Sequence, residues 1–300
     1  MNPIKNPSPA TRFDFPIRNK LRFVASYVAH KTFLLFRDVE HPRTRLFVYE
    51  IIYSLCRALG RPPLPLRWLD IRRIKSRFGT FDVRPGTIDA ACASPAFERL
   101  DIDRLGAEVA VRLAAGKRVV FADVGADIGT YTITIARRAP HGANLHVVAF
   151  EPSQESFSIL EKNIDLNGLG EHVAARRLAC DDGSATSATL TFDELEPGSS
   201  GIRTDLVHGT STEVVSVSTI DKELTGIGDG AVLVLKLDVE GYEVAVLRGA
   251  TDTIDRAEES LLLVEDFVDD RVVEYLQRSG WEFVDKLTPY NSFWRTTRTS

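Results

Sequence analysis

The chain has 300 residues, a formal net charge of −5, 44% hydrophobic residues and 26% charged residues. This composition is typical of a globular protein with a hydrophobic core and excludes an intrinsically disordered or fibrous chain. Because the length is at the upper limit for one core, we expect one large domain with an accessory segment.

Cysteine usage and hydropathy bear on the compartment. The three cysteines, Cys56, Cys92 and Cys180, lie far apart without a C-x-x-C pair, which fits a reducing environment. We find no pattern of a secretory signal. The most apolar stretch, residues 21–36, contains charged side chains and is shorter than the roughly 20 apolar residues that span a bilayer. We therefore expect a cytoplasmic protein without a transmembrane helix.

Charge is distributed unevenly along the chain. Residues 1–80 hold 16 Lys and Arg against 5 Asp and Glu, a balance of +11, which leaves 21 − 37 = −16 for the remainder. Apolar residues recur at helical spacing over 17–36 and 46–59, so we expect residues 1–70 to form a basic helical segment and residues 71–300 to form the main domain. The positive charge predicts an acidic partner, which is the rest of the chain, an anionic acceptor, or the inner face of a membrane contacted peripherally.

The main domain begins with a predicted hairpin at residues 71–84. From residue 118 onward, short β-branched runs alternate with helical patterns, as in a parallel sheet with crossover helices. The predicted strands are 119–124, 145–151, 173–179, 232–238 and 261–265, and the predicted helices are 130–138, 154–166, 242–250 and 270–279.

Two antiparallel features complete the predicted fold. The alternating runs 188–192 and 213–217 predict an insertion after the third strand, with a tip at 199–212 rich in Ser, Gly and Thr. The runs 281–287 and 290–296 predict a closing hairpin at one edge of the sheet. The fold class is therefore α/β, with a Rossmann-like, mostly parallel sheet, an antiparallel C-terminal hairpin and a helical N-terminal segment.

The first predicted strand ends in a turn with two acids and two glycines: Asp123, Gly125, Asp127 and Gly129. Such a turn places a ligand crevice at the carboxyl end of the strand. The middle glycine that a dinucleotide pyrophosphate requires is absent. Carboxylates here would repel a pyrophosphate but accept hydrogen bonds from an ammonium group, which predicts S-adenosylmethionine as the cofactor.

The next two strand ends are also acidic. Glu151 follows the last glycine of the turn by 22 residues, about the spacing at which an acid meets ribose hydroxyls. Asp181 ends the third strand and is the candidate acceptor for the adenine amino group. Singly, these acids and glycines fit helix caps and turns equally well. Their recurrence at three successive strand ends favours a nucleotide site.

Three segments resemble the FkbM-type methyltransferases: DVGADIGTYT from Asp123, FEPSQESFSILEKNIDLNG from Phe150 and KLDVEGYEVAVLRGA from Lys236. The resemblance covers roughly residues 75–290. It implies a class I methyltransferase sheet, S-adenosylmethionine as methyl donor, and O-methylation of a sugar, polyketide or other small or glycan acceptor. Asp127 departs from the family, which commonly has Asn there, and adds a negative charge beside the methionine carboxylate.

The fourth strand end supplies the catalytic candidates. Alternation directs Lys236, Asp238 and Glu240 toward the crevice. Asp238 is the leading candidate for a base or acceptor-orienting group; the alternative is a buried ion pair in which Lys236 is neutralised by Asp238 or Asp123. His208 in the insertion is a further candidate base, against the alternative of a solvated loop histidine.

Other acids lie near the same edge. Glu265 ends the fifth strand on the acceptor side or caps a helix, and Glu240 and Glu243 could bind acceptor hydroxyls or a metal. Without histidines at fixed spacing the metal signal is weak, so we expect no obligate metal.

Four functions remain open from the residues. An O-methyltransferase for a glycan or small metabolite ranks first. An N- or RNA methyltransferase is second. It is disfavoured because adenine-directed enzymes often carry an Asn/Asp-Pro-Pro-aromatic turn after the fourth strand, whereas this chain has Asp-Val-Glu-Gly from Asp238. A nicotinamide oxidoreductase is third, and it is disfavoured because the turn of this chain lacks the middle glycine that such an enzyme requires. The fourth possibility is a non-catalytic S-adenosylmethionine-binding module, which would not need the carboxylates at the end of the fourth strand. Nucleic acid is not an expected partner.

Overall fold

A computed structural model describes most of the main domain: residues 72–85, 87–93, 98–192, 200–202, 211–266, 271–288 and 290–297. The basic helical segment predicted at residues 1–70 lies outside the described residues, and so do its two predicted helices.

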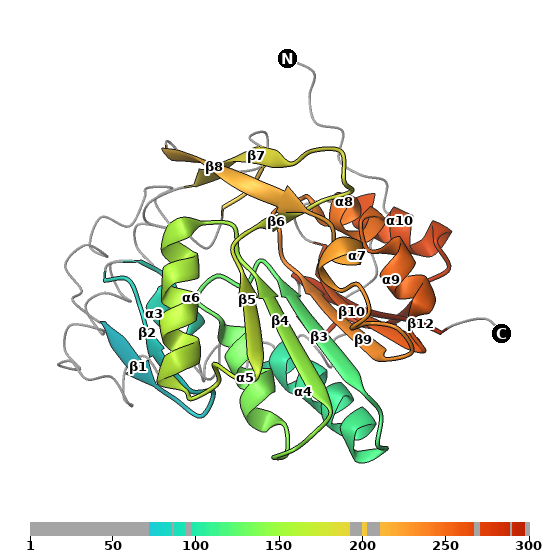
Figure 1. Cartoon of the computed structure of the whole chain (residues 1–300), viewed down its shortest axis with the longest axis horizontal. Helices are drawn as coiled ribbons and strands as arrows, with labels where there is room; N and C mark the ends of the chain where they lie inside the picture. The colour runs from blue at the N-terminus through green and yellow to red at the C-terminus, as the bar shows by residue number, and fades with distance from the viewer. Residues whose placement is uncertain are drawn as a thin grey trace.

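The described residues contain a seven-stranded sheet in the order β11-β12-β10-β9-β3-β4-β5 (Figure 1). Its strands are β3 (Val119–Val124), β4 (Leu145–Phe150), β5 (Val173–Arg176), β9 (Val232–Leu237), β10 (Glu259–Glu265), β11 (Glu282–Asp285) and β12 (Asn291–Thr297). Neighbours from β10 to β5 run parallel, whereas β12 is antiparallel to both β10 and β11. The predicted mostly parallel sheet with an antiparallel C-terminal hairpin is confirmed.

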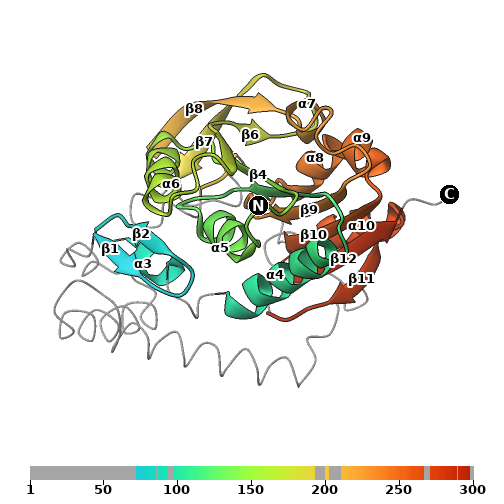
Figure 2. The same cartoon turned by 60° about the horizontal axis from the view of Figure 1, so that its bottom comes forward.

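Helices cover both faces of the sheet (Figure 2). In β3, Val119 and Phe121 point into one apolar core, while Val120 and Ala122 point into a second core on the opposite face. The first core is covered by α4 (Arg99–Ala114), α5 (Thr130–Arg138) and α6 (Gln154–Leu166), and the second by α7 (Ile220–Glu223), α8 (Glu243–Arg248), α9 (Thr251–Arg256) and α10 (Arg271–Arg278). Strands buried on both faces read as continuous apolar runs, which is why they are visible in the sequence.

The third predicted strand, 173–179, is wrong as a single strand. β5 ends at Arg176, and Ala179–Cys180 forms a separate strand, β6, that pairs with β8 (Ser211–Ser218) instead of β4. β8 also pairs with β7 (Ser187–Phe192), so the predicted insertion exists as a three-stranded sheet. This small sheet lies over the carboxyl ends of the central strands (Figure 1), where it can close a binding site.

The predicted amino-terminal hairpin is also present. β1 (Arg73–Lys75) pairs with β2 (Thr80–Asp82), and the next helix is α3 (Asp89–Cys92). Two asparagines fix the hairpin: Asn163 of α6 bonds the backbone of Asp82, and Asn167, the C-cap residue of α6, bonds the backbone of Thr80. The hairpin is therefore held against the first helix layer. Among the described residues, no helix has the length and hydropathy needed to cross a membrane.

Candidate cofactor and acceptor site

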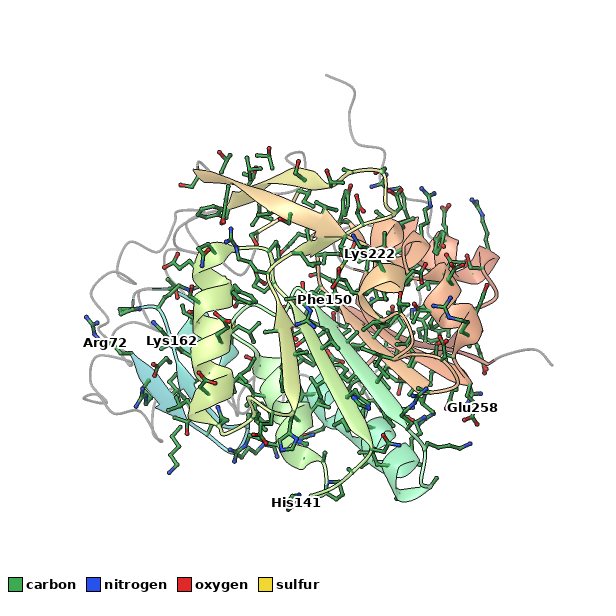
Figure 3. The ribbon with its side chains drawn as sticks, in the orientation of Figure 1. Arg72, His141, Phe150, Lys162, Lys222 and Glu258 are labelled. Carbon is green, nitrogen blue, oxygen red and sulfur yellow. The ribbon has the colours of Figure 1, made fainter. Side chains whose placement is uncertain are left out.

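A pocket lies at the carboxyl edge of the sheet and is lined by both polar and apolar side chains. Phe150 marks this edge in Figure 3, whereas His141 and Glu258 lie at the opposite end of the sheet. Strand-end residues of β3, β4 and β9 line one side, and Leu190 and Ile202 of the insertion line the other. The pocket therefore sits in the crevice that parallel α/β sheets use for ligands.

Gly125 brings two strand ends together. Its φ is 77°, and a Cβ there would lie 1.9 Å from the backbone oxygen of Asp238. Gly129 has a φ of 91° and is the N-cap residue of α5, and a Cβ there would lie 2.6 Å from Leu160 of α6. Gly125 lines the pocket and Gly129 does not. As a cofactor contact Gly129 stays a prediction, and its observed role is to let α5 and α6 pack closely.

Asp123 is fully buried and lies outside the pocket lining. One carboxylate oxygen accepts hydrogen bonds from the backbone nitrogen and hydroxyl of Thr132, at 3.0 and 2.6 Å. The other lies 3.5 Å from Lys236 Nζ. Burial raises the pKa of Asp123, which the Lys236 charge and the Thr132 bonds oppose. Asp123, which was predicted to accept from the ammonium group of the cofactor, thus anchors the start of α5 and pairs with Lys236.

Glu151 lines the pocket although its side chain is almost fully buried. Its two oxygens accept backbone hydrogen bonds from Asp127 and Ser153, each at 2.9 Å. Burial, assisted by the negative charge of Asp127, raises the pKa of Glu151 to about 7. Each carboxylate oxygen has a second lone pair, so Glu151 can still accept from ribose hydroxyls as predicted.

The predicted adenine acceptor, Asp181, does not line the pocket. It is buried, and its carboxylate accepts from the backbone nitrogen of Gly183 at 2.7 Å. Its neighbour Cys180 lines the pocket instead, together with apolar residues of β6 and the insertion and with Tyr242. This apolar slot can accept a purine ring, because small-molecule sites bury such surfaces between apolar side chains.

Lys236 ties the ends of β3 and β9 together. Nζ lies 2.8 Å from the backbone oxygen of Gly125 and 3.3 Å from the Asp238 carboxylate. Burial alone would lower the pKa of Lys236, but the nearby Asp238 and Asp123 outweigh it and raise the pKa. Lys236 therefore stays charged and cannot act as a base. The ion pair foreseen as an alternative is present, while Asp238 remains 38% exposed and lines the pocket.

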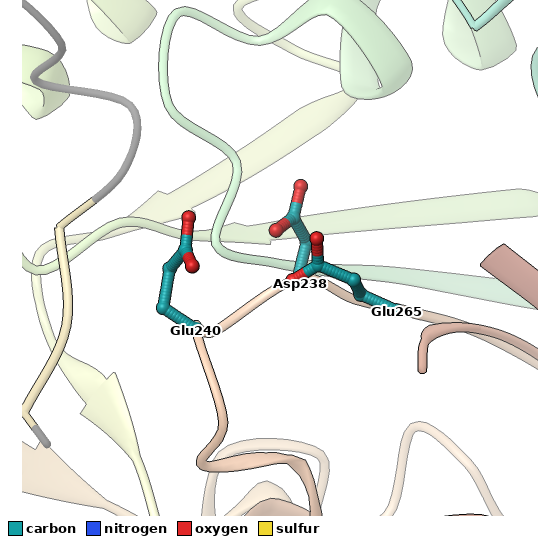
Figure 4. Close-up of side chains that lie close together, drawn as sticks. All are labelled: Asp238, Glu240 and Glu265. Carbon is teal, nitrogen blue, oxygen red and sulfur yellow. The ribbon is translucent and has the colours of Figure 1, made fainter. Parts of the chain in front are cut away.

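Three carboxylates, including that of Asp238, converge at this edge of the sheet (Figure 4). Ligand oxygens of Asp238, Glu240 and Glu265 all lie within 4.8 Å of one another. Burial, followed by the charges of Asp238 and Glu240, raises the pKa of Glu265 to about 10, so Glu265 is protonated at neutral pH. The cluster can therefore accept hydrogen bonds from the hydroxyl groups of a methyl acceptor and donate hydrogen bonds to them. Glu243 is not part of it, because its carboxylate accepts from the backbone nitrogens of Val239 and Gly241.

Glu98 and Tyr131 are polar residues of this region that the sequence analysis missed. Glu98 is the N-cap residue of α4, yet its side chain forms no cap and accepts instead from the Tyr131 hydroxyl at 2.7 Å. Burial and the charge of Asp238 raise the pKa of Glu98 to about 8. The Tyr131 ring centroid lies 5.3 Å from Lys236 Nζ. These largely buried contacts extend the polar network from Asp238 toward α4.

Backbone strain gathers at the same edge. Among the described residues, the non-glycine residues with positive φ are Glu98, Asp127 and Glu240. Strain of this kind costs about 1–3 kcal/mol per residue and persists where the surroundings impose it, often at functional sites.

His208, the remaining catalytic candidate, lies outside the described residues.

A doubly wound sheet with a pocket at its carboxyl edge, an acid at the end of β4 and no dinucleotide turn defines a nucleotide-cofactor domain of the methyltransferase type. Residues 123–283 match the methyltransferase FkbM domain, and the chain belongs to this family. The cofactor of the family is S-adenosylmethionine. The residues fit it: Glu151 for the ribose, the apolar slot for adenine, and no Cβ at Gly125 to obstruct the turn.

Two curated relatives are methyltransferases. Methyltransferase 1 of Beauveria bassiana is 29% identical over 149 residues, covering 43% of this chain and 57% of that protein. Hexuronic acid methyltransferase AglP of Haloferax volcanii is 31% identical over 135 residues, covering 44% of this chain and 50% of that protein. The chain thus spans about half the length of the curated relatives it matches.

Among solved structures, the METTL16 MTase domain has a TM-score of 0.45 and 9% identity, and the match covers 95% of this chain and 98% of that one. The T. thermophilus 16S rRNA methyltransferase RsmC has a TM-score of 0.43 and 16% identity, with 76% and 50% covered.

Proposed function

We propose that the chain transfers the methyl group of S-adenosylmethionine to a hydroxyl oxygen of a glycan or small metabolite. The observation that carries this proposal is the position of Asp238, which both lines the cofactor pocket and belongs to the carboxylate cluster. Methyl transfer requires an acceptor oxygen aligned with the donor and a group that takes or orients its proton. Asp238 is placed for that second task.

The neighbouring residues support a hydroxyl acceptor. Lys236 fixes the Asp238 carboxylate through an ion pair in which Nζ lies 3.3 Å from the carboxylate oxygen. Protonated Glu265 can donate a hydrogen bond to a second oxygen of the methyl acceptor. Several hydroxyl groups in a row, as on a sugar, suit a cluster that both accepts and donates hydrogen bonds. The relative AglP of Haloferax volcanii is a hexuronic acid methyltransferase, which is consistent with a sugar acceptor for this chain.

Acceptor charge is a separate question. An anionic acceptor and a membrane-surface contact are proposals that rest on the charge of residues 1–80. The described acceptor side is rich in carboxylates, which favours a neutral hydroxyl-rich acceptor unless basic groups elsewhere compensate.

The decisive experiment measures S-adenosylhomocysteine release with a panel of acceptors: neutral hexosides, hexuronic acids, small phenols and nucleosides, each with and without a chelator. We expect turnover with at least one hydroxyl acceptor, unaffected by the chelator. Turnover with nucleosides alone, with the methyl group found on a base nitrogen, would contradict O-methylation, and cofactor binding without turnover on any arm would favour a non-catalytic module.

A further inference from the structure

The buried Arg84 lies before the matched family domain yet reaches the cofactor turn. Its guanidinium holds Asp89 through two bonds of 2.8 and 2.9 Å, and it donates to Ser156 Oγ at 2.9 Å. Nη2 also donates to Asp127 Oδ1 at 2.8 Å. The side chain is only 7% exposed. Because the guanidinium is planar and rigid, these bonds fix one another's geometry.

Asp127 is the end of this network that faces the pocket. Oδ1 accepts from Arg84 and from Ser156 Oγ, the latter at 3.0 Å, and the residue adopts a φ of 44°. Its side chain is 21% exposed and lines the pocket. One oxygen is therefore held, and the carboxylate keeps acceptor capacity on the pocket side. The backbone nitrogen of Asp127 bonds Glu151, so the orientation of this residue also affects the ribose ligand.

Charge balance makes Arg84 necessary at this place. Burial lowers the pKa of Arg84, but Asp127 and Asp89 outweigh it and raise the pKa, so the guanidinium stays charged. One cation between two carboxylates leaves a net charge of about −1 by formal count, and without the cation Asp89 and Asp127 would repel each other. The remaining negative charge is placed to attract a ligand ammonium.

We propose that Arg84 is a positioning residue that holds the Asp127 carboxylate toward the methionine ammonium of S-adenosylmethionine. This inference rests on the proposed function, because it assumes that S-adenosylmethionine occupies the pocket. It also makes the segment between β2 and α3, outside residues 123–283, part of the cofactor site.

The test compares three ligands on the full chain by calorimetric titration. S-adenosylmethionine and S-adenosylhomocysteine carry the amino-acid end, whereas 5′-methylthioadenosine has the same adenosine without it. Asp127→Ala should weaken the first two about tenfold, the scale of one charge-assisted hydrogen bond, and 5′-methylthioadenosine by less than about twofold. Arg84→Lys should weaken the same two at least about threefold, because an ammonium cannot keep all the bonds of the fork.

A double variant and a control separate positioning from general destabilisation. If Arg84 acts through Asp127, the variant with both changes should bind S-adenosylmethionine no more weakly than Asp127→Ala alone. Arg73→Gln removes the 2.6 Å pair with Asp82 in the same amino-terminal hairpin and should leave all three affinities unchanged. Additive losses in the double variant would overturn the inference.

Two further outcomes would also overturn it: equal weakening of all three ligands, which indicates a collapsed pocket, or unchanged affinities. If Arg84→Lys does not fold, Ser156→Ala removes the other donor to Asp127 Oδ1 and should selectively weaken the two amino-acid ligands. Failure of the wild-type chain to bind any of the three ligands would refute the proposed function itself.

Discussion

Glu151 offers the most direct test of the ribose site, through the pH dependence of binding. Its pKa in the folded chain is about 7, above the ordinary 4.5, so burial disfavours the ionised form by about 3 kcal/mol. The stability of the folded chain at low pH is therefore partly lost as the pH rises from 4.5 through 7. Ribose hydroxyls that donate to the carboxylate favour its ionised form, and binding should tighten over the same range.

The expected size follows from the fraction ionised. At pH 6 about one tenth of Glu151 is ionised, and at pH 8 nearly all of it is. Binding of 5′-methylthioadenosine should therefore tighten up to about tenfold between these pH values. This ligand is the right probe because it lacks an α-amino group, whose own pKa of about 8 would interfere.

The matched variant is Glu151→Gln. It should bind about tenfold to a hundredfold more weakly at pH 8, since a charge-assisted hydrogen bond is lost and an amide NH₂ meets a backbone donor. It should also show no pH dependence, as measured by titration calorimetry at pH 6, 7 and 8. Glu155→Gln, at an exposed position of α6, serves as the control. An affinity that is equal at pH 6 and pH 8 in the wild type, or a slope that survives in Glu151→Gln, would refute the assignment.

Three further substitutions test the acceptor side and the turn. Asp238→Asn should lower kcat at least about a hundredfold with cofactor Kd nearly unchanged; an unfolded variant would show that the ion pair with Lys236 dominates. Glu265 has a pKa of about 10 against an ordinary 4.5, so the wild type loses stability as the pH rises toward 10. The Tm of Glu265→Gln should therefore rise relative to the wild-type Tm between pH 6 and pH 9. A difference in Tm that stays constant over this range would contradict the assignment. Left-handed strain costs a residue with a Cβ about 1–2 kcal/mol, and Gly125→Ala should lower the free energy of unfolding by clearly more, because its Cβ would also meet the backbone oxygen of Asp238. Gly142→Ala, at a position with a similar φ and open surroundings, measures the strain alone. Equal losses of Tm in the two variants would show that the approach of Asp238 is unimportant.

Features encoded by neighbouring residues were predictable from the sequence. Strand β3 and helices α5 and α6 have the predicted bounds, because an apolar run buried on both faces is followed by a glycine turn, and Ser153 caps α6. Glu151 and Asp238 line the pocket as expected. Both follow directly from parallel topology, which places the carboxyl ends of strands at one edge.

Side-chain direction was less predictable at strand ends. Asp123 and Asp181 occupy the expected edge, yet Asp123 bonds Thr132 inside the fold and Asp181 bonds the backbone of Gly183. A carboxylate at a strand end has local donors available within a few residues. Which of them it uses depends on where the next helix or strand leaves the sheet, and here the chain departs early into β6.

Contacts across long sequence separations were not predictable, and they govern the charge of the site. Arg84 and Asp127 are 43 residues apart, and Glu98 and Tyr131 are 33 residues apart. From the sequence, Asp127 is an added negative charge, which is correct for the residue but incomplete for the site, because Arg84 pairs with it. A buried arginine between two carboxylates has no spacing of its own that could reveal it. An acid-to-amide change at Asp127 alone would leave Arg84 balanced by Asp89 and remove the net negative charge of the network, so its effect must be interpreted together with variants of Arg84.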